Sequence, residues 1–382
     1  MYIKNAYVVL LVATCLILNG CSENLYESEN DKSTTDNQSE ASYNLTESKK
    51  INDNIVLEKD INSVQMPDKQ LDIIPVKLKD FDFNEFGSML FDNVKPDIEH
   101  EDTFTVYKYG DKQLYIYNGN IEYETNLSNY INEIVVTDNV SSNNIDAFTK
   151  KSLEFMTREQ AIDKATDFLN KLNISYMKEP KVYALDMDTL QKEQNLYKKQ
   201  IEKDDWLQEM QEKGKINLKS KWEKSDECYY LIFDASLENT KVYSDSYIIQ
   251  ESDGLNVDGS KIEIMISKDG IVYCNIGMIY EKSGSQIKQS KIISLDEMLN
   301  ILSEKYSQII LESPITIKDI SFEYCVVPTK IDRSSSGAII NQEFEMVPSW
   351  ILNTVQTANA RGETMTLNKN IIINAQTGEF IE

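Results

Sequence analysis

The sequence has few of the residues on which several kinds of functional site depend. Its 382 residues include one histidine, His100, and five cysteines. A single imidazole excludes a histidine-rich metal site and leaves one candidate for a catalytic triad that needs histidine. Lysine and arginine total 39 against 63 aspartates and glutamates, which gives a formal net charge of −24. This deficit argues against a nucleic-acid partner, because phosphate contacts need a basic surface.

Membrane-spanning runs and familiar catalytic motifs are also missing. The apolar run from Ala6 to Leu18 is shorter than the ~20 residues that a helix needs to cross a bilayer. The sequence contains no G-x-S-x-G, H-E-x-x-H, P-loop or G-x-G-x-x-G motif. We therefore predict no catalytic residue, no cofactor and no metal ligand from motifs.

Three polar segments resemble functional sites only in part. His100 lies among acidic neighbours, Glu99, Glu101 and Asp102. We predict a solvated loop histidine, with a general base as the alternative. The segments 80–91 and 254–265 contain several oxygen ligands, but both lack the combination of glycine and terminal glutamate that an EF-hand loop requires. We predict a turn that leads into a helix and a loop that connects strands.

Residues 1–20 have the order of a secretory signal peptide. Lys4 supplies the positive charge, and the apolar run ends in Leu18-Asn19-Gly20-Cys21. This ending resembles the bacterial lipobox. The resemblance implies cleavage between Gly20 and Cys21 and a diacylglyceryl group on the Cys21 thiol. It places the chain at the cell membrane, lipid-anchored on the extracytoplasmic face. An ordinary cleaved signal and an uncleaved short anchor are the alternatives.

The segment 21–60 is predicted to be a disordered polar tether. It is rich in serine, asparagine, aspartate, glutamate and threonine, and its apolar residues are scattered. Such a composition cannot bury enough surface to fold, so the segment would link an anchor to a folded domain. Frequent asparagine, isoleucine, lysine and tyrosine in the whole chain are compatible with a low-GC Gram-positive source.

Three cysteines remain once Cys15 and Cys21 are assigned to the signal and the anchor. Cys228, Cys274 and Cys325 lie in or beside strand-like runs, and none belongs to a C-x-x-C pair. We predict buried thiols rather than a zinc or redox site. One disulfide with one free thiol is the alternative.

The folded part is predicted to be α+β, with a β-rich N-terminal segment over 61–150. A short helix near Asn84–Phe91 precedes three alternating runs, and Asn118-Gly119 marks a tight turn between two of them. The alternating runs are 103–109, 113–117 and 121–125. They predict a small antiparallel meander.

Two helix-and-sheet units are predicted to follow, over 151–290 and 291–382. Each begins with a capping box, at Thr157–Gln160 and at Ser294–Glu297, followed by an apolar helical face. A second, polar helix is expected over 188–212. Strands are expected at 228–237, 242–250, 261–267, 271–279, 315–327, 350–355 and 370–374. The repeated order predicts, in each unit, a helix packed on a curled antiparallel sheet.

These units resemble a known family. The Thr-Arg-Glu-Gln-Ala helix start and the ending Asn-Ala-Gln-Thr-Gly-Glu at 374–379 are similar to the PepSY-like units of Gram-positive, clostridial-type envelope lipoproteins. Val347-Pro348-Ser349-Trp350 is similar to a strand of YycH/YycI-type regulators. The resemblance implies sheet-packing roles for these motifs and carries over no catalytic residue.

Tyrosines gather in the predicted meander. Tyr107, Tyr109, Tyr115 and Tyr117 alternate along adjacent strands. We expect them on one sheet face, where they would form cross-strand pairs that stabilise the sheet. The alternative is that they stack on sugar rings or line a protein interface.

The sequence therefore predicts a lipid-anchored binding or regulatory protein without enzymatic activity. Its expected partners are the membrane, through the anchor, and a membrane or envelope protein, through direct contact. Nucleic acid is not an expected partner. An envelope hydrolase that uses paired carboxylates and a small-ligand capture lipoprotein are the alternatives.

Overall fold

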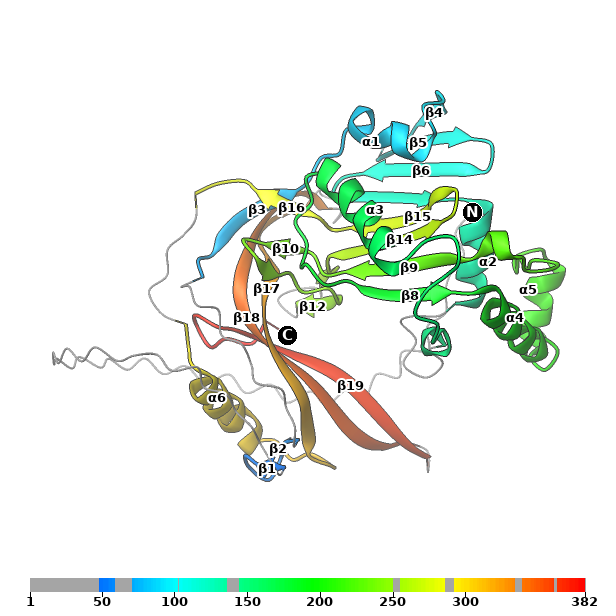
Figure 1. Ribbon diagram of the computed structural model, residues 1–382. Coiled ribbons are helices and arrows are strands. Elements are labelled where there is room, and N and C mark those ends of the chain that lie inside the picture. The colour runs from blue at the N-terminus through cyan, green and yellow to red at the C-terminus, as the bar shows by residue number, and fades with distance from the viewer. Residues whose placement is uncertain are drawn as a thin grey trace. The chain divides into compact units, whose positions relative to one another are not determined.

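The structure is a computed structural model that describes residues 48–58, 71–101, 103–135, 144–249, 255–285, 292–333, 339–360 and 363–381. All of these residues belong to one compact unit, Glu40–Glu382. Within them the fold is mixed α+β, as predicted, and is built from two large open sheets and six α-helices. Figure 1 shows both sheets and their helices.

The first sheet has eight antiparallel strands. Their order is β4 (Asp97–His100), β5 (Phe104–Tyr109), β6 (Lys112–Tyr117), β7 (Asn120–Glu124), β15 (Gly270–Gly277), β14 (Lys261–Ser267), β9 (Cys228–Phe233) and β8 (Lys181–Leu185). The predicted meander is confirmed as β5, β6 and β7. Because β7 pairs with β15, strands from the 61–150 and 151–290 segments share this sheet. The predicted boundary at 150 therefore does not coincide with a sheet boundary.

The second sheet contains the two longest strands. Its order is β1 (Lys49–Lys50), β2 (Ile55–Leu57), β17 (Ile315–Arg333), β18 (Ile339–Ala360), β3 (Ile74–Leu78) and β16 (Tyr280–Lys282), with β19 (Glu363–Asn374) also paired to β18. The predicted tether is wrong for its last part. Ile55 and Leu57 are buried, and β2 pairs in parallel with β17. Burial of these two apolar residues offsets the entropy lost by ordering a polar segment.

Two short hairpins complete the strands. They are β10 (Ser236–Leu237) with β11 (Thr240–Lys241), and β12 (Tyr247–Ile249) with β13 (Leu255–Val257). The strand expected over 242–250 is therefore reduced to β12.

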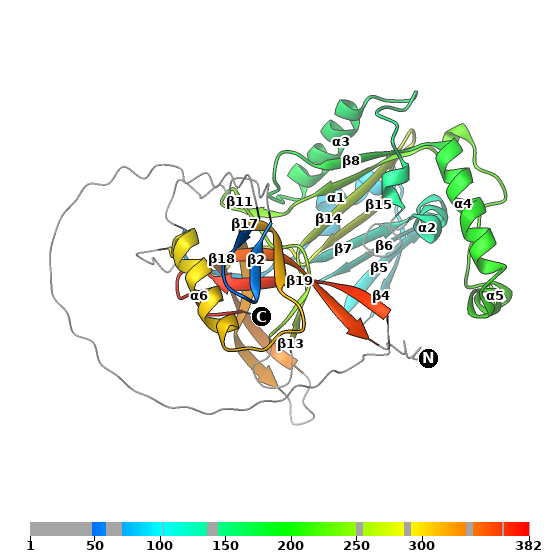
Figure 2. The same ribbon diagram turned by 90° about the horizontal axis from the view of Figure 1, so that it is seen from below.

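Helices lie on both faces of the first sheet and on the second sheet. They are α1 (Phe83–Leu90), α2 (Asn126–Ile134), α3 (Arg158–Lys171), α4 (Met187–Ile201), α5 (Asp205–Glu212) and α6 (Leu295–Ser307). Two 3-10 turns lie at Ile145–Ala147 and Lys224–Asp226. Figure 2 shows α6 beside β2 and β18.

Capping explains where the helices begin. Both predicted capping boxes are present, at the start of α3 and at the start of α6. The single helix expected over 188–212 is two helices. The Asp204 carboxylate accepts hydrogen bonds from the amides of Trp206 and Leu207, and so starts a new helix. Thr125 and Ser128 form a further capping box, which starts α2 and was not predicted.

Three apolar clusters hold these layers together. The largest lies on the face of the first sheet that α1 and α3 cover, and it includes residues of β17 and β18. A second lies between α6 and the second sheet around Trp350. A third lies under α2 and α4 on the opposite face of the first sheet, around Trp222. Full burial of one such large apolar side chain stabilises the fold by about 1.5–3 kcal/mol. Among the described residues no helix has the length and apolarity to cross a membrane.

Candidate functional site

Strand register divides the four predicted tyrosines between two faces of the first sheet. Tyr109 lies opposite Lys112 across a two-residue turn, so odd-numbered residues of β5 lie opposite even-numbered residues of β6. Directly opposite residues project from the same face. Tyr107 and Tyr109 therefore project toward the α3 face, and Tyr115 and Tyr117 toward the other. The expectation of one shared face is wrong, because alternation within each strand does not determine the register between strands.

Two tyrosines on the α3 face, Tyr107 and Tyr123, have packing roles. The Tyr107 ring stacks on Phe83 of α1, with ring centroids 4.1 Å apart and planes 5° apart. Tyr123 of β7 is fully buried, and its hydroxyl donates to the Leu90 carbonyl over 3.1 Å. Tyr109 is exposed at the end of its strand. The predicted structural role therefore describes Tyr107.

Helices α2 and α4 cover only part of the opposite face. We call the remainder the open face. It comprises residues that are half-buried or exposed on strands β5, β6, β7, β8, β14 and β15: Phe104, Lys108, Gln113, Tyr115, Tyr117, Glu122, Glu124, Lys181, Lys261, Glu263 and Asn275. Tyr117 is 41% exposed. This face combines aromatic rings, carboxylates and ammonium groups, and no helix of the described residues covers it.

A polar network crosses the centre of the open face. Glu122 lies opposite Asn275, which lies opposite Glu263 on the next strand. The Tyr230 hydroxyl donates to Oε1 of Glu263 over 2.8 Å, and Asn275 Nδ2 donates to Oε2 over 3.4 Å. Nearer the β4 edge, the Tyr115 hydroxyl donates to Gln113 Oε1 over 2.9 Å. These bonds hold the polar side chains of the face in position.

Partial burial changes the acidity of groups on this face. Burial raises the pKa of the Glu124 carboxyl, and the neighbouring Glu122 adds to the effect. Burial also raises the pKa of the Tyr115 hydroxyl, with a contribution from Glu124. The hydrogen bond from Lys108 to Glu99, 2.6 Å long, raises the pKa of that lysine. The face therefore presents phenols that stay protonated and carboxylates that gain from a cationic partner.

A cavity of about 490 Å³ adjoins the open face beside β8, β9 and β14. The charged side chains that line it come from β8, β14 and the loops beside them: Glu179, Lys181, Asp234, Asp245, Lys261 and Glu263. Ser244, Ser246 and Ser260 add hydroxyl groups, and Ile232 and Phe233 add apolar surface. Asn370 of β19 donates to Asp245 over 3.0 Å, which ties this wall to the second sheet. A cavity of this size and polarity suits a small polar ligand.

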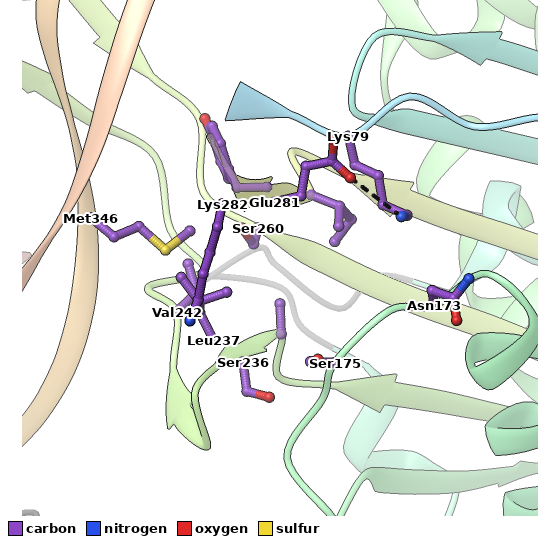
Figure 3. Close-up of a pocket in the computed structure, with 13 residues that line it drawn as sticks. Lys79, Asn173, Ser175, Ser236, Leu237, Val242, Ser260, Glu281, Lys282 and Met346 are labelled. Carbon is purple, nitrogen blue, oxygen red and sulfur yellow. Dashed lines mark ion pairs between the residues drawn. The ribbon is translucent and has the colours of Figure 1, made fainter. Parts of the chain in front are cut away.

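A smaller cavity, of about 160 Å³, lies where the chain passes from β15 to β16 (Figure 3). Its lysines are engaged by acids. Lys79 lies 3.6 Å from Glu281, and Lys282 pairs with Glu238. Met346, Val242 and Leu237 form an apolar wall. We interpret this cavity as part of the joint between the sheets.

The most deeply buried acids serve the fold. Asp186 caps α4, accepting from the Thr189 amide and hydroxyl, and lies 2.8 Å from Lys150. The neighbouring Glu227 accepts from the Met187 amide over 3.1 Å and pairs with Lys224 over 3.3 Å. Both carboxylates meet the positive end of α4, so the helix start explains their burial.

Glu323 of β17 is a second kind of buried acid. Its Oε1 accepts from Ser321 and lies 3.3 Å from Lys241, whereas its Oε2 has no hydrogen-bond partner in the described part of the chain. Burial raises the pKa of the Glu323 carboxyl. Lys241 also lies 3.4 Å from Asp234, and these two carboxylates raise its pKa although burial lowers it.

The other predicted residues have these positions. Gly20 and Cys21 lie outside the described residues. His100 is exposed on β4, with Nδ1 3.2 Å from the Thr105 hydroxyl. Asp82 caps α1, as the predicted turn requires. The remaining three cysteines are buried free thiols, Cys228, Cys274 and Cys325. A metal site needs at least three histidine, cysteine, aspartate or glutamate side chains close together. The described ranges contain no such group.

Comparison with known proteins adds fold information. No family model and no curated protein matches the chain. Among solved structures, the chain is similar to an uncharacterized protein from Eubacterium rectale ATCC 33656. That match has a TM-score of 0.60 and 18% sequence identity, and it covers 88% of this chain and 92% of that chain. At this identity the likeness shows a shared fold and nothing about activity.

Proposed function

We propose that this chain is a lipid-anchored extracytoplasmic binding protein that acts by contact with a membrane or envelope protein. The observation that carries the proposal is the open face of the first sheet. It leaves Tyr115 and Tyr117 on the same face as the carboxylates of Glu122, Glu124 and Glu263, and no helix of the described residues lies over them. The lipobox-like ending at Cys21 supports the location.

The chemistry of the open face favours a partner with basic side chains. Tyrosine supplies contact area at a low cost in conformational entropy. The half-buried carboxylate of Glu124 has a raised pKa because burial and Glu122 disfavour its charge. An approaching cation would relieve this repulsion and lower that pKa. Two PepSY-like units remain part of the proposal, supported by α3 on the first sheet and α6 on the second.

Photocrosslinking in intact cells tests the proposed contact. A photoreactive residue replaces Tyr117, which is 41% exposed on the open face. The matched control replaces Tyr109, which is 49% exposed on the opposite face of the same hairpin. Cys21→Ala serves as the control for location. We expect one dominant protein adduct from position 117, little from position 109, and loss of the adduct in Cys21→Ala.

Two results would oppose this proposal. Equal adducts from positions 117 and 109 would indicate unspecific collision with neighbouring proteins. An adduct at 117 that persists in Cys21→Ala would separate binding from the proposed anchor.

A second candidate function is capture of a small polar ligand in the 490 Å³ cavity. Its mixed charges favour a zwitterionic compound, such as an amino acid or a short peptide. Thermal shifts with panels of amino acids, short peptides and sugars test this, with Lys181→Ala as the variant that should lose the shift. Product analysis of the same mixtures tests the alternative of a hydrolase that uses paired carboxylates.

A further inference from the structure

A cavity of about 430 Å³, here called the second-sheet cavity, lies on the second sheet. Strand register forms its floor, because Val327 of β17 lies opposite Glu345 of β18, and Val347 follows two residues farther along β18. Residues two apart on a strand project from the same face. Asn374 of β19 lies opposite Ser349, the next residue of that face, and also lines the cavity. The cavity is as large as many small-molecule sites.

The walls of the second-sheet cavity come from distant parts of the chain. Ile249 belongs to β12, Lys305 to α6, and Phe380 and Ile381 to the C-terminal residues. Phe380 pairs with Ile373 of β19, so the end of the chain lies along that strand and near α6 (Figure 2). Most of the residues that line the cavity are apolar. Its interior therefore favours a ligand with an apolar body.

One end of the cavity carries an ammonium group without a carboxylate partner. The Nζ atom of Lys305 lies 3.3 Å from the centroid of the Phe380 ring. Within the described residues no carboxylate forms an ion pair with this lysine. Burial lowers the pKa of the Lys305 ammonium, and the nearby Lys369 adds to the effect. An anionic ligand group at this end would stabilise the charged form of the lysine.

Asn374 adds a hydrogen-bond donor at the same end. Its backbone amide donates to the Glu379 carbonyl over 2.8 Å, directly beside Phe380. Its Oδ1 accepts from the backbone amides of Gln376 and Thr377, whereas its Nδ2 makes no hydrogen bond within the described residues. Glu379 also lines the cavity, but it is exposed and its carboxylate accepts from the Thr377 hydroxyl over 3.2 Å. This end therefore offers two donors to a carboxylate.

A carboxylate lies at the other end of the cavity. Glu345 lies opposite Val327, and among the described residues no ammonium group pairs with it. Glu345 is four residues along β18 from Ser349, the residue opposite Asn374. Four residues of a strand correspond to about 13 Å. The cavity thus has donors at one end, an acceptor about 13 Å away, and apolar side chains between them.

A peptide with free termini has the matching chemistry. It carries a carboxylate at one end and an amine at the other, and about four extended residues span ~13 Å. We propose that the second-sheet cavity binds a short apolar peptide of about four residues, with its carboxylate at Lys305 and Asn374 and its amine at Glu345. This cavity shares no lining residue with the 490 Å³ cavity and lies apart from the open face. The proposal and the proposed function therefore succeed or fail separately.

Calorimetric titration of the purified full chain with the tetrapeptide Ala-Leu-Ala-Leu tests the ligand class. We expect leucine alone to bind at least about tenfold more weakly, because it reaches only one end of the cavity. N-acetylation removes the charge of the amine, and C-terminal amidation removes that of the carboxylate. Each modification should weaken binding about tenfold.

Two variants assign the ends. Lys305→Met keeps an unbranched side chain over Phe380 and removes the charge. It should weaken binding of the unmodified tetrapeptide about tenfold and leave binding of the amidated one unchanged. Glu345→Gln should weaken binding of the unmodified tetrapeptide equally and leave binding of the acetylated one unchanged. Lys330→Met and Glu343→Gln are the matched controls, because these residues make the same charge changes on β17 and β18 outside the cavity.

Several results would overturn this proposal. They are no binding of the tetrapeptide at ~1 mM, equal affinity for leucine and the tetrapeptide, and equal losses in the controls. A variant that weakens binding of all forms of the peptide alike would also contradict the assigned ends. Thermal unfolding midpoints of the four variants show whether each chain remains folded, so a loss of binding is attributed to the cavity only where the midpoint is kept.

Discussion

At the scale of single residues, buried charge in this protein is compensated locally. Asp186 is 1% exposed, yet it caps a helix and pairs with Lys150. Burial alone would raise the pKa of the Asp186 carboxyl. Hydrogen bonds from Lys150 and Thr189 outweigh that effect, and the pKa is lowered from its ordinary value of 3.8. The carboxylate thus stabilises the fold in its charged form.

Replacing Asp186 tests this role. Asp186→Ala removes the cap and the ion pair, and we expect the free energy of unfolding to fall by about 2 kcal/mol at neutral pH. Because the folded pKa lies below the unfolded one, the contribution is complete above the unfolded pKa and is lost as pH falls through the folded pKa. Urea unfolding of both chains should therefore give a difference that shrinks only below about pH 4.

Asp188→Ala is the matched control for Asp186→Ala. The Asp188 carboxylate lies 3.7 Å from the same lysine, but its side chain is 74% exposed. We expect a much smaller loss of stability, because solvent screens an exposed ion pair. Equal losses in the two variants would show that Lys150, and not the cap, accounts for the effect.

At the scale of elements, turns also join the sheets. Gly119 closes the β6–β7 hairpin with a positive φ of 75°. Its amide donates to the Lys79 carbonyl over 2.9 Å, and its carbonyl accepts from Ile279 over 3.0 Å. Lys79 directly follows β3, and Ile279 directly precedes β16. These two bonds therefore connect a turn of the first sheet to two strands of the second sheet. A Cβ at Gly119 would lie 2.6 Å from Leu78 Cδ2.

Alanine at two turns separates backbone strain from this packing. Gly110 has a positive φ of 61° and open space around its Cα. Gly110→Ala should cost about 1 kcal/mol through strain alone. Gly119→Ala should cost clearly more, because the new methyl group also displaces Leu78 at the joint. Denaturant midpoints measure both, and a Gly119→Ala loss no larger than that of Gly110→Ala would contradict the proposed joint.

At the scale of the whole molecule, net charge is the dominant electrostatic feature. The chain carries −24, and most of its ion pairs join exposed or half-exposed side chains. Exposed pairs contribute little, whereas repulsion among excess carboxylates acts on the entire compact state.

Salt should therefore stabilise the fold. Raising sodium chloride from ~10 mM to ~150 mM shortens the screening length from ~30 Å to ~8 Å. We expect the thermal unfolding midpoint to rise over this range. Potassium chloride should act equally, which excludes specific sodium binding. A midpoint that falls with salt would mean that ion pairs outweigh the repulsion.

Sequence patterns predicted individual helices and strands better than they predicted which strands pair with each other. Capping boxes located α3 and α6, and alternation with turn residues located β5, β6 and β7. The α2 cap was missed because Ser128 occupies the place where glutamate or glutamine is the usual signal. The row of polar residues Glu122, Asn275 and Glu263 on the open face was not predicted. These residues become neighbours only because strands from distant segments of the chain pair with each other.

By itself the sequence determined the α+β class, the charge, the lipobox-like ending and most helix starts, since these depend on composition or on residues within one turn of each other. The tertiary structure alone decided which face each tyrosine occupies, that β7 joins β15, and that β19 pairs with β18. These outcomes depend on strand register and on contacts between residues far apart in the chain. A shift of one residue reverses every face, so local pattern leaves such outcomes open.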